Sequence, residues 1–194
     1  MWRGIMDKEQ IIGFVAKKLE DEDPGVRRVA VEALGDMGDK KAVDSLIKML
    51  SDSNQRIRSK TEKALIKIGK PSVKPLINAL KFEENVVRAS AARVLGKIED
   101  KDAVLPLINI LNDGDKQVRK EAALSLMHLG WKAKNVEEEA YYLIAMNSWN
   151  FAEIGGPSAA VNALTQFLDD KDIEIRKHVI NSLSKAYTDL KRGT

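Results

Sequence analysis

The sequence predicts an all-α protein: a right-handed α-solenoid (α/α superhelix) of two-helix repeats of about 31 residues, with one helical insertion in the fourth repeat. The first observation is a recurring dipeptide of an apolar residue and arginine. Its arginines are spaced by 31, 30, 31 and 57 residues. The second is apolar spacing typical of amphipathic helices, and the third is that no run alternates apolar and polar residues. A fixed period of this length indicates stacked two-helix units. The repeated arginines are Arg27, Arg58, Arg88, Arg119 and Arg176.

The dipeptide opens the first helix of each repeat, which we name helix A. In the central repeat the apolar face is Val87, Ala91, Leu95 and Ile98, offsets that share one side of an α-helix. Three residues before each dipeptide stands a polar residue that is expected to cap the helix. These residues are Asp23, Asn54, Glu84, Asp115 and Asp172.

A shorter amphipathic helix, which we name helix B, follows each helix A. Pro75 and Pro106 fall in its first turn, where proline is tolerated. Its apolar positions again have the spacing of three and four residues that predicts a helix. They are Val43, Leu46, Ile47 and Leu50, then Val73, Leu76, Ile77 and Leu80, then Val104, Leu107, Ile108 and Leu111.

This unit resembles the HEAT-like repeat of the phycocyanobilin-lyase (PBS lyase) family. The resemblance covers nearly the whole chain except the insertion, and it implies a HEAT-like solenoid fold. It implies little about function, because such modules serve many tasks. In the first repeat the matching residues are Asp21-Glu22-Asp23, Val26-Arg27, Ala30, Ala33-Leu34-Gly35, Gly38-Asp39, Ala42-Val43, Leu46-Ile47 and Leu50.

The repeats predict a single domain over residues 1–194. From the dipeptide to the leucine of helix B, the first repeat needs 20 residues and the fourth needs 46, which places an insertion in the fourth. Terminal units of a solenoid are usually atypical, since each has only one neighbour. The predicted segments are an N-terminal half repeat (7–19), three repeats (21–50, 52–80 and 82–111), a repeat (113–168) with the insertion 131–156, and a C-terminal capping helix (170–190).

Composition excludes several classes of site. The chain has no cysteine, so it has no disulfide, thiolate nucleophile or cysteine metal ligand. A net charge of +3 does not by itself indicate nucleic-acid binding. No apolar run has the length of a membrane span, and residues 1–10 lack the apolar region of a signal peptide. We expect a cytoplasmic protein with no cofactor.

The arginine column (Arg27, Arg58, Arg88, Arg119 and Arg176) allows two hypotheses. The favoured one is a structural ladder, in which each guanidinium reaches an aspartate of an adjacent repeat, because its planar fork suits carboxylates. The other is a phosphate-binding ridge, reinforced by further cations. No aromatic stacking partners recur along this edge, which disfavours nucleic acid. Those cations are Arg28, Arg56, Lys120 and Lys177.

Helix B is expected to line the concave surface, which is the usual binding surface of a solenoid. Four of the eight solvent-facing residues are amides, which suits hydrogen bonding to a protein or peptide better than binding a polyanion. The alternative is an ordinary solvated surface. The predicted partner-binding residues are Asp44, Lys48, Lys74, Asn78, Leu105, Asn109, Asn162 and Gln166.

The insertion concentrates aromatic residues in a chain that contains only 5% of them. They could line a pocket for a ligand or a partner helix, but packing within the enlarged repeat is the favoured interpretation. The two histidines, His128 and His178, are not followed by glutamate. The iron site of deoxyhypusine hydroxylase, another HEAT-repeat protein, is therefore not expected. The inserted aromatics are Trp131, Tyr141, Tyr142, Trp149 and Phe151.

The expected function is a non-enzymatic scaffold that binds a protein partner on the helix B face, because no catalytic constellation is found. The family resemblance offers an alternative, a phycobilin-lyase-like enzyme subunit. Binding of nucleic acid along the arginine edge is the third possibility, and it predicts a steep dependence of affinity on salt.

Overall fold

The computed structural model describes residues 7–148 and 157–192, and within these ranges every regular element is helical. Helices A and B alternate along the chain at the predicted spacing. The predicted all-α repeat solenoid is therefore confirmed. The structure separates into two compact units, Met1–Ala103 and Val104–Thr194, which are described in turn. The single domain inferred from the repeats stays a prediction.

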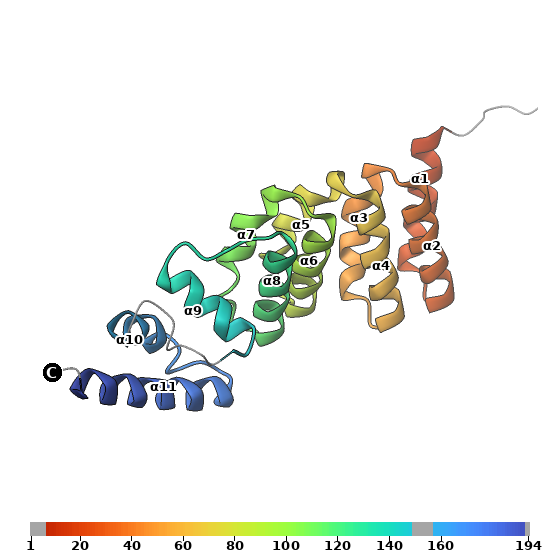
Figure 1. The fold of residues 1–194 in the computed structure, drawn as a ribbon. Coiled ribbons are helices and arrows are strands. Elements are labelled where there is room, and N and C mark those ends of the chain that lie inside the picture. The colour runs from red at the N-terminus through yellow and green to blue at the C-terminus, as the bar shows by residue number, and fades with distance from the viewer. Residues whose placement is uncertain (1–6, 149–156, 193–194) are drawn as a thin grey trace, which may run out of the picture. The chain divides into compact units, whose positions relative to one another are not determined.

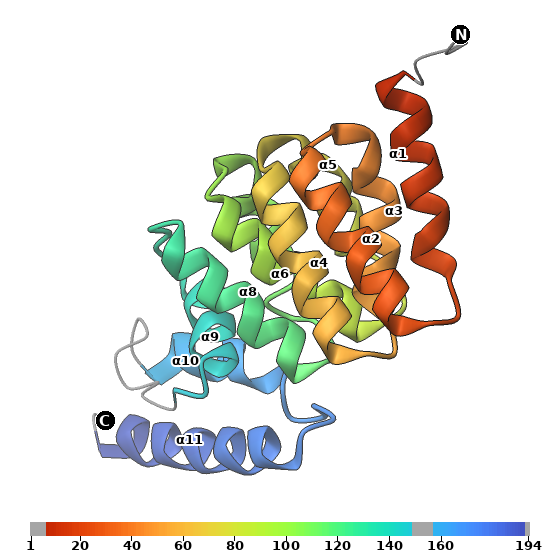
Figure 2. The same cartoon turned by 90° about the vertical axis from the view of Figure 1, so that its right-hand side faces the viewer.

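The first unit contains two layers of helices (Figures 1 and 2). The A helices α2, α4 and α6 lie side by side in one layer, and α3 and α5 pack together in the other. Short 3-10 helices begin or extend the B helices. The helices are α1 (Lys8–Lys17), α2 (Pro24–Met37), α3 (Val43–Lys48), α4 (Gln55–Ile68), α5 (Val73–Ala79) and α6 (Asn85–Ile98), and the 3-10 helices are Lys18–Glu20, Lys40–Ala42, Met49–Ser51, Lys70–Ser72 and Lys101–Ala103.

The helix starts follow the capping chemistry of the sequence. The Asp23 carboxylate accepts hydrogen bonds from the amides of Gly25 and Val26, and the Asn54 side chain accepts one from the Arg56 amide. Asp7 begins α1 with a capping box that includes Gln10. Glu84 makes no such side-chain bond, because its carboxylate is one carbon further from the backbone than that of aspartate.

The core of the first unit consists of leucine and small residues. Leu34, Leu65 and Leu95, which share one repeat position, are fully buried. Helices α2 and α4 approach closely at Gly35, where an added Cβ would lie 2.7 Å from the Cβ of Ala64. Small residues therefore set the spacing between neighbouring A helices. Met37 ends α2 and is exposed, whereas Ile68, at the same repeat position, ends α4 and is buried.

The second unit contains the enlarged repeat and the last helix A. Helix α9 lies within the predicted insertion and packs against both α8 and α10. The Asn135 side chain caps α9 by accepting from the Glu138 amide. The second part of the insertion, including Trp149 and Phe151, lies outside the described residues. The helices are α7 (Val104–Asn109), α8 (Lys116–His128), α9 (Val136–Ala145), α10 (Pro157–Thr165) and α11 (Ile173–Arg192).

The core of the second unit joins the insertion to the repeat. Ala140 and Ile144 of α9 pack in one cluster with Phe167, Ile175 and Val179. The ring of Tyr141 meets that of Phe167 edge-on, with centroids 5.1 Å apart. The described part of the insertion thus packs into the core of its repeat.

Candidate functional site

The helix B face of the first unit is formed by α3 and α5. Asp44 and Lys48 lie one turn apart on α3, and Lys74 and Asn78 occupy the same two positions on α5. All four side chains are exposed, and none of them hydrogen-bonds or forms an ion pair within the described residues. These four predicted partner-binding residues therefore share one solvated face.

The helix B face of the second unit differs in character. Leu105 at the start of α7 is 66% exposed, with Asn109 one turn further on and also exposed. Asn162 lies on α10, and Gln166 follows the end of this helix. The Gln166 side chain accepts a hydrogen bond from the Tyr141 hydroxyl of α9. Sequence reasoning missed this contact, because it joins residues 25 positions apart through the insertion.

Each arginine of the column binds the loop that precedes its own helix A. Arg27 donates from Nη1 to the carbonyl oxygens of Asp21 and Glu22, at 2.9 and 3.0 Å. The other members repeat the contact: Arg58 with Asp52 and Ser53, Arg88 with Phe82 and Glu83, Arg119 with Asp113, and Arg176 with Asp170.

Arg27 also reaches the next repeat. Its Nε lies 2.7 Å from Oδ2 of Asp52, and its Nη2 lies 3.2 Å from Oδ1, a two-point contact between α2 and the loop before α4. Burial acts to raise the pKa of the Asp52 carboxyl, but the hydrogen bonds from Arg27 and the Asn54 amide outweigh it and lower that pKa. The same hydrogen bond raises the pKa of Arg27.

Other members of the column have less complete carboxylate contacts. Arg119 is only 2% exposed, and its Nη1 lies 3.5 Å from Oδ2 of Asp170. Its Nη2 has no hydrogen-bond partner among the described residues. Phe82 stands where the next repeat would supply an aspartate to Arg58, and no carboxylate in the described ranges contacts Arg58. The position of an arginine in the repeat therefore predicts its contact with the loop carbonyl oxygens. It predicts less well whether the arginine pairs with a carboxylate of the next repeat.

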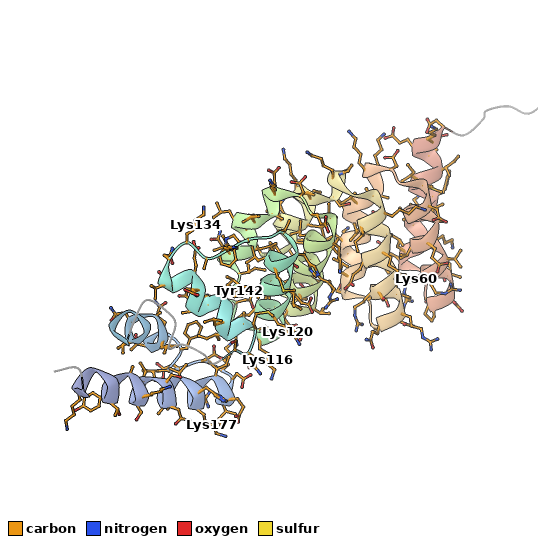
Figure 3. All side chains as sticks on the ribbon, viewed as in Figure 1. Lys60, Lys116, Lys120, Lys134, Tyr142 and Lys177 are labelled. Carbon is orange, nitrogen blue, oxygen red and sulfur yellow. The ribbon has the colours of Figure 1, made fainter. Side chains whose placement is uncertain are left out.

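Several cations beside the column are paired with acids. Arg28 contacts Glu32 at 3.2 Å, and Lys177 contacts Glu174 at 2.9 Å. Figure 3 shows Lys116 and Lys120 near each other on α8; Lys116 pairs with Asp172 at 3.2 Å. The edge therefore carries interleaved charges of both signs.

The aromatic residues of the insertion pack among themselves and with the core. Trp131 and Tyr142 have ring centroids 5.7 Å apart and are both half-buried. The hydroxyl of Tyr141 is held by Gln166, and burial, with the charge of Glu137, raises its pKa. These contacts fit a packing role for the described aromatics.

The described residues contain neither a metal-binding cluster nor a membrane-spanning helix. Within residues 7–148 and 157–192, no three His, Cys, Asp or Glu residues gather in a way that could hold a metal ion. His128 is exposed, and Nδ1 of His178 lies 2.8 Å from the carbonyl oxygen of Glu174. Over the same ranges, no helix combines the length and apolarity needed to cross a bilayer.

Paired helices at a fixed period, with a solvated helix B face and an arginine in the first turn of each repeated helix A, define a helical repeat protein. The family model described as HEAT repeats matches residues 12–81 and 73–150, which together exceed half of the chain. The protein therefore belongs to the HEAT repeats family, which confirms the repeat resemblance found in the sequence.

Two relatives are similar to this chain in sequence. The chain is 34% identical to the bilin biosynthesis protein MpeU of Synechococcus sp. (strain WH8020) over 104 residues, 49% of this chain and 32% of the relative. It thus spans about a third of that protein's length. It is also 23% identical to the phycocyanin operon protein Z of Pseudanabaena tenuis (strain PCC 7409) over 185 residues, 87% of this chain and 92% of the relative.

Two solved structures have similar helical arrangements. The complex of CpcE and CpcF of phycocyanin lyase from Nostoc sp. PCC7120 matches with a TM-score of 0.40 at 18% identity, covering 95% of this chain and 97% of that chain. A designed armadillo repeat protein in complex with the peptide (KR)4 matches with a TM-score of 0.41 at 17% identity, covering 92% and 82%.

Proposed function

We propose that the protein is a non-enzymatic scaffold that binds a protein partner through its helix B face. The observation that carries the proposal is Leu105, a large apolar side chain left 66% exposed on this face. Asn109 lies one turn away on the same helix and can donate and accept hydrogen bonds. An apolar anchor beside amides is the chemistry of a protein-binding surface rather than of a polyanion site.

The helix B face of the first unit, taken by itself, carries charges of both signs. Asp44 and Lys48 are one turn apart on α3, and Lys74 with Asn78 repeats the arrangement on α5. Because these side chains have no partners within the described chain, a ligand can engage them without breaking internal contacts. We propose that they select a partner segment of mixed charge.

A second candidate function is that of a phycobilin-lyase-like subunit. Sequence similarity to a bilin biosynthesis protein and to a phycocyanin operon protein supports it. On this hypothesis the partner bound by the helix B face is a bilin-carrying protein, and the chemistry belongs to another subunit. We assign no catalytic residue for it.

The arginine column is proposed to be structural, and nucleic acid is not the proposed ligand. The Nη1 groups of its arginines face loop carbonyl oxygens, and two of the neighbouring cations are paired with acids. The column therefore offers few free cations to phosphates. Binding that weakens steeply with salt would contradict this part of the proposal.

The test is affinity purification of the tagged chain from its native source, with mass spectrometry and an absorbance spectrum of the eluate. We expect one stoichiometric protein partner whose recovery falls at least ~10-fold with Leu105→Asp, because a charge at an apolar anchor must be desolvated. Met127→Asp, at an exposed apolar residue of α8, is the matched control. Equal recovery with both variants would overturn the proposed face. A visible chromophore in the eluate would select the lyase-like alternative.

A further inference from the structure

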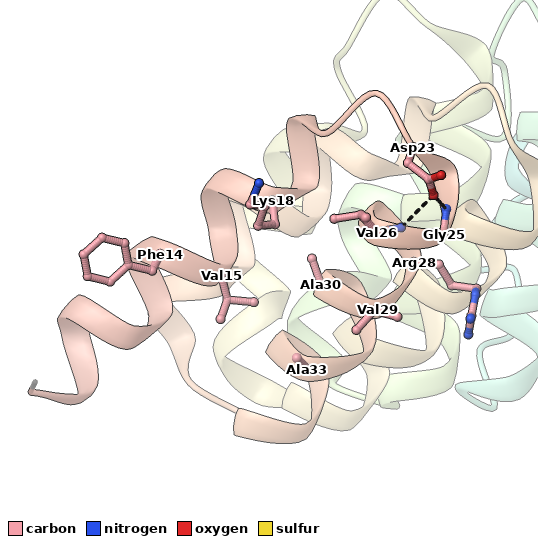
Figure 4. A pocket seen from close by; sticks show the side chains of 10 residues that line it. All are labelled: Phe14, Val15, Lys18, Asp23, Gly25, Val26, Arg28, Val29, Ala30 and Ala33. Carbon is pink, nitrogen blue, oxygen red and sulfur yellow. Dashed lines mark hydrogen bonds between the residues drawn. The ribbon is translucent and has the colours of Figure 1, made fainter.

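An apolar groove opens between α1 and α2 in the first unit (Figure 4). It has a volume of about 720 Å³ and is lined by Phe14 and Val15 of α1 and by Val26, Val29 and Ala33 of α2. Val26 is 38% exposed and Val29 is 56% exposed. Such a cluster of exposed valine and phenylalanine side chains needs an explanation beyond the fold of the unit.

The repeat itself identifies what covers this surface elsewhere. Ile57 of α4 and Val87 of α6 occupy the position of Val26, and both are buried. Helix α4 packs against α2, and α6 packs against α4. In the later repeats, the helix A that comes before thus contributes to covering this face. The groove on α2 is the same face without that neighbour in the described structure.

The complementary face is exposed on the last helix A. Ile180 of α11 is 55% exposed, and Tyr187 is also exposed two turns further on. Val31 holds the position of Ile180 in α2, is fully buried, and lies on a helix that packs against the following helix A. Helix α11 therefore presents the apolar side by which one helix A contacts the next.

The charges at the two surfaces also match. Arg27 contacts Asp52 of the following repeat, and Asp21 stands at the equivalent position in the loop before α2. Arg176 of α11 donates to the backbone of Asp170, and no carboxylate in the described part of the chain contacts it. Asp21 is paired with the exposed Lys18 of its own chain at 3.1 Å, so Arg176 of a second copy would share this carboxylate with Lys18 in one further contact of this kind.

We infer that two copies of the chain associate head to tail, with α11 of one copy docked in the α1–α2 groove of the second copy. The docked helix takes the place of a preceding helix A, covers Val26 and Val29 with Ile180, and brings Arg176 to Asp21 of the second copy. Such an interface is heterologous, so the pair keeps a free groove on one copy and a free α11 face on the other, and further copies can add as concentration rises.

The test is sedimentation velocity of the full chain over a range of concentrations, with two variants that each damage one surface. Val29→Asp places a carboxylate in the groove, and Ile180→Asp places one on the α11 face. Each variant alone is expected to weaken self-association at least ~10-fold, because the new charge must be desolvated at an apolar interface. Met127→Asp should associate as the unmodified chain does.

An equimolar mixture of the two variants separates this model from others. The intact α11 of Val29→Asp can enter the intact groove of Ile180→Asp, so the mixture should form one-to-one dimers that cannot grow. A symmetric groove-to-groove dimer predicts no such rescue. An unmodified chain that stays monomeric at every concentration, or a mixture that stays monomeric, overturns the inference. Circular dichroism melting of each variant establishes that both remain folded.

Discussion

The first and second units bury their apolar surfaces with different residues. In the first, leucines at one repeat position are fully buried, and Gly35 lets α2 and α4 approach closely. In the second, Phe167 and Ile144 fill a cluster that also contains Val179 of α11. Of the two leucines at the same repeat position, Leu126 of α8 is fully buried, but Leu183 of α11 is only partly buried. A repeat position therefore predicts which way a residue faces, but its neighbours decide how completely it is buried.

The insertion explains this difference. In the first unit each helix A packs against the next, whereas in the second α9 packs against α8 and α10. The inserted helix supplies its own apolar residues to the core and brings Tyr141 to Phe167. An enlarged repeat can thus keep the helix pattern of the family while using a different core.

The largest effect is expected from Phe167→Ala, which removes the aromatic residue at the centre of the second core. We expect the free energy of unfolding to fall by about 3–5 kcal/mol, from lost apolar transfer and the cavity left behind. Denaturant unfolding monitored by circular dichroism measures it. Phe82→Ala, at an exposed phenylalanine, is the control and should cost far less. Equal losses would mean that the aromatic cluster does not hold the second unit together.

The leucine position gives a direct comparison of the two units. Leu95→Ala should cost about 2–5 kcal/mol, since this side chain is fully buried in α6. Leu183→Ala, at the same repeat position in α11, should cost less because its side chain already contacts solvent. The same unfolding experiment compares the pair. A larger loss for Leu183→Ala would show that burial in the second unit follows the repeat after all.

The contact between Arg27 and Asp52 makes stability depend on pH. The pKa of Asp52 lies below its ordinary value of 3.8 in the folded protein, so the folded state binds fewer protons than the unfolded state. The contribution of the contact is present above pH 3.8 and is lost as pH falls through the folded-state pKa. Asp52→Asn should lower the Tm at neutral pH by less than Leu95→Ala does.

The Tm difference between Asp52→Asn and the unmodified chain should shrink as pH falls below 3.8 and through the folded-state pKa of Asp52, because the protonated carboxyl, like the asparagine amide, carries no charge. Other carboxylates with lowered pKa values, Asp21 and Asp36 among them, are present in both chains and cancel in the difference. A difference that stays constant with pH would assign the effect to hydrogen bonding or packing rather than to charge.

The smallest effect is expected at Phe82, where the carboxylate contact between neighbouring repeats is missing. Phe82→Asp supplies the carboxylate that Arg58 lacks and should raise stability by at most about 1 kcal/mol, as for a solvent-accessible ion pair. Phe82→Asn controls for the loss of the exposed ring without adding charge. If Phe82→Asp were no more stable than Phe82→Asn in thermal melting, the carboxylate contact would contribute nothing at this loop.

The helices and caps follow from local chemistry, which is why the sequence predicts them well. Aspartate or asparagine three residues before the arginine dipeptide caps its helix, as Asp23 does. Glycine ends α2 at Gly38 with positive φ, but α6 ends at Glu99 in the same conformation without glycine. Glu99 is exposed, and the repeat pattern does not predict that a residue other than glycine adopts this conformation.

The exposure of the predicted binding residues also follows from the pattern, because their helix positions are opposite the core. Their partners within the chain do not follow from it: Tyr141 reaches Gln166 only because α9 packs on α10. The groove beside Val29 was equally invisible, since the repeat rules place Val29 on the surface without saying what neighbour is missing. The periodicity of the sequence predicts which side of each helix is exposed, whereas a binding surface depends on how several helices pack together.

The loop contacts of the arginine column have a consequence for how such a chain can change in length. Arg27 holds the carbonyl oxygens of Asp21 and Glu22, and Arg58 does the same for Asp52 and Ser53, so each loop is fixed by a residue of its own repeat. Only the carboxylate contact crosses to the next repeat. A deletion or duplication of one whole period would leave every loop with its own arginine, which makes gene-level gain and loss of repeats tolerable to the fold.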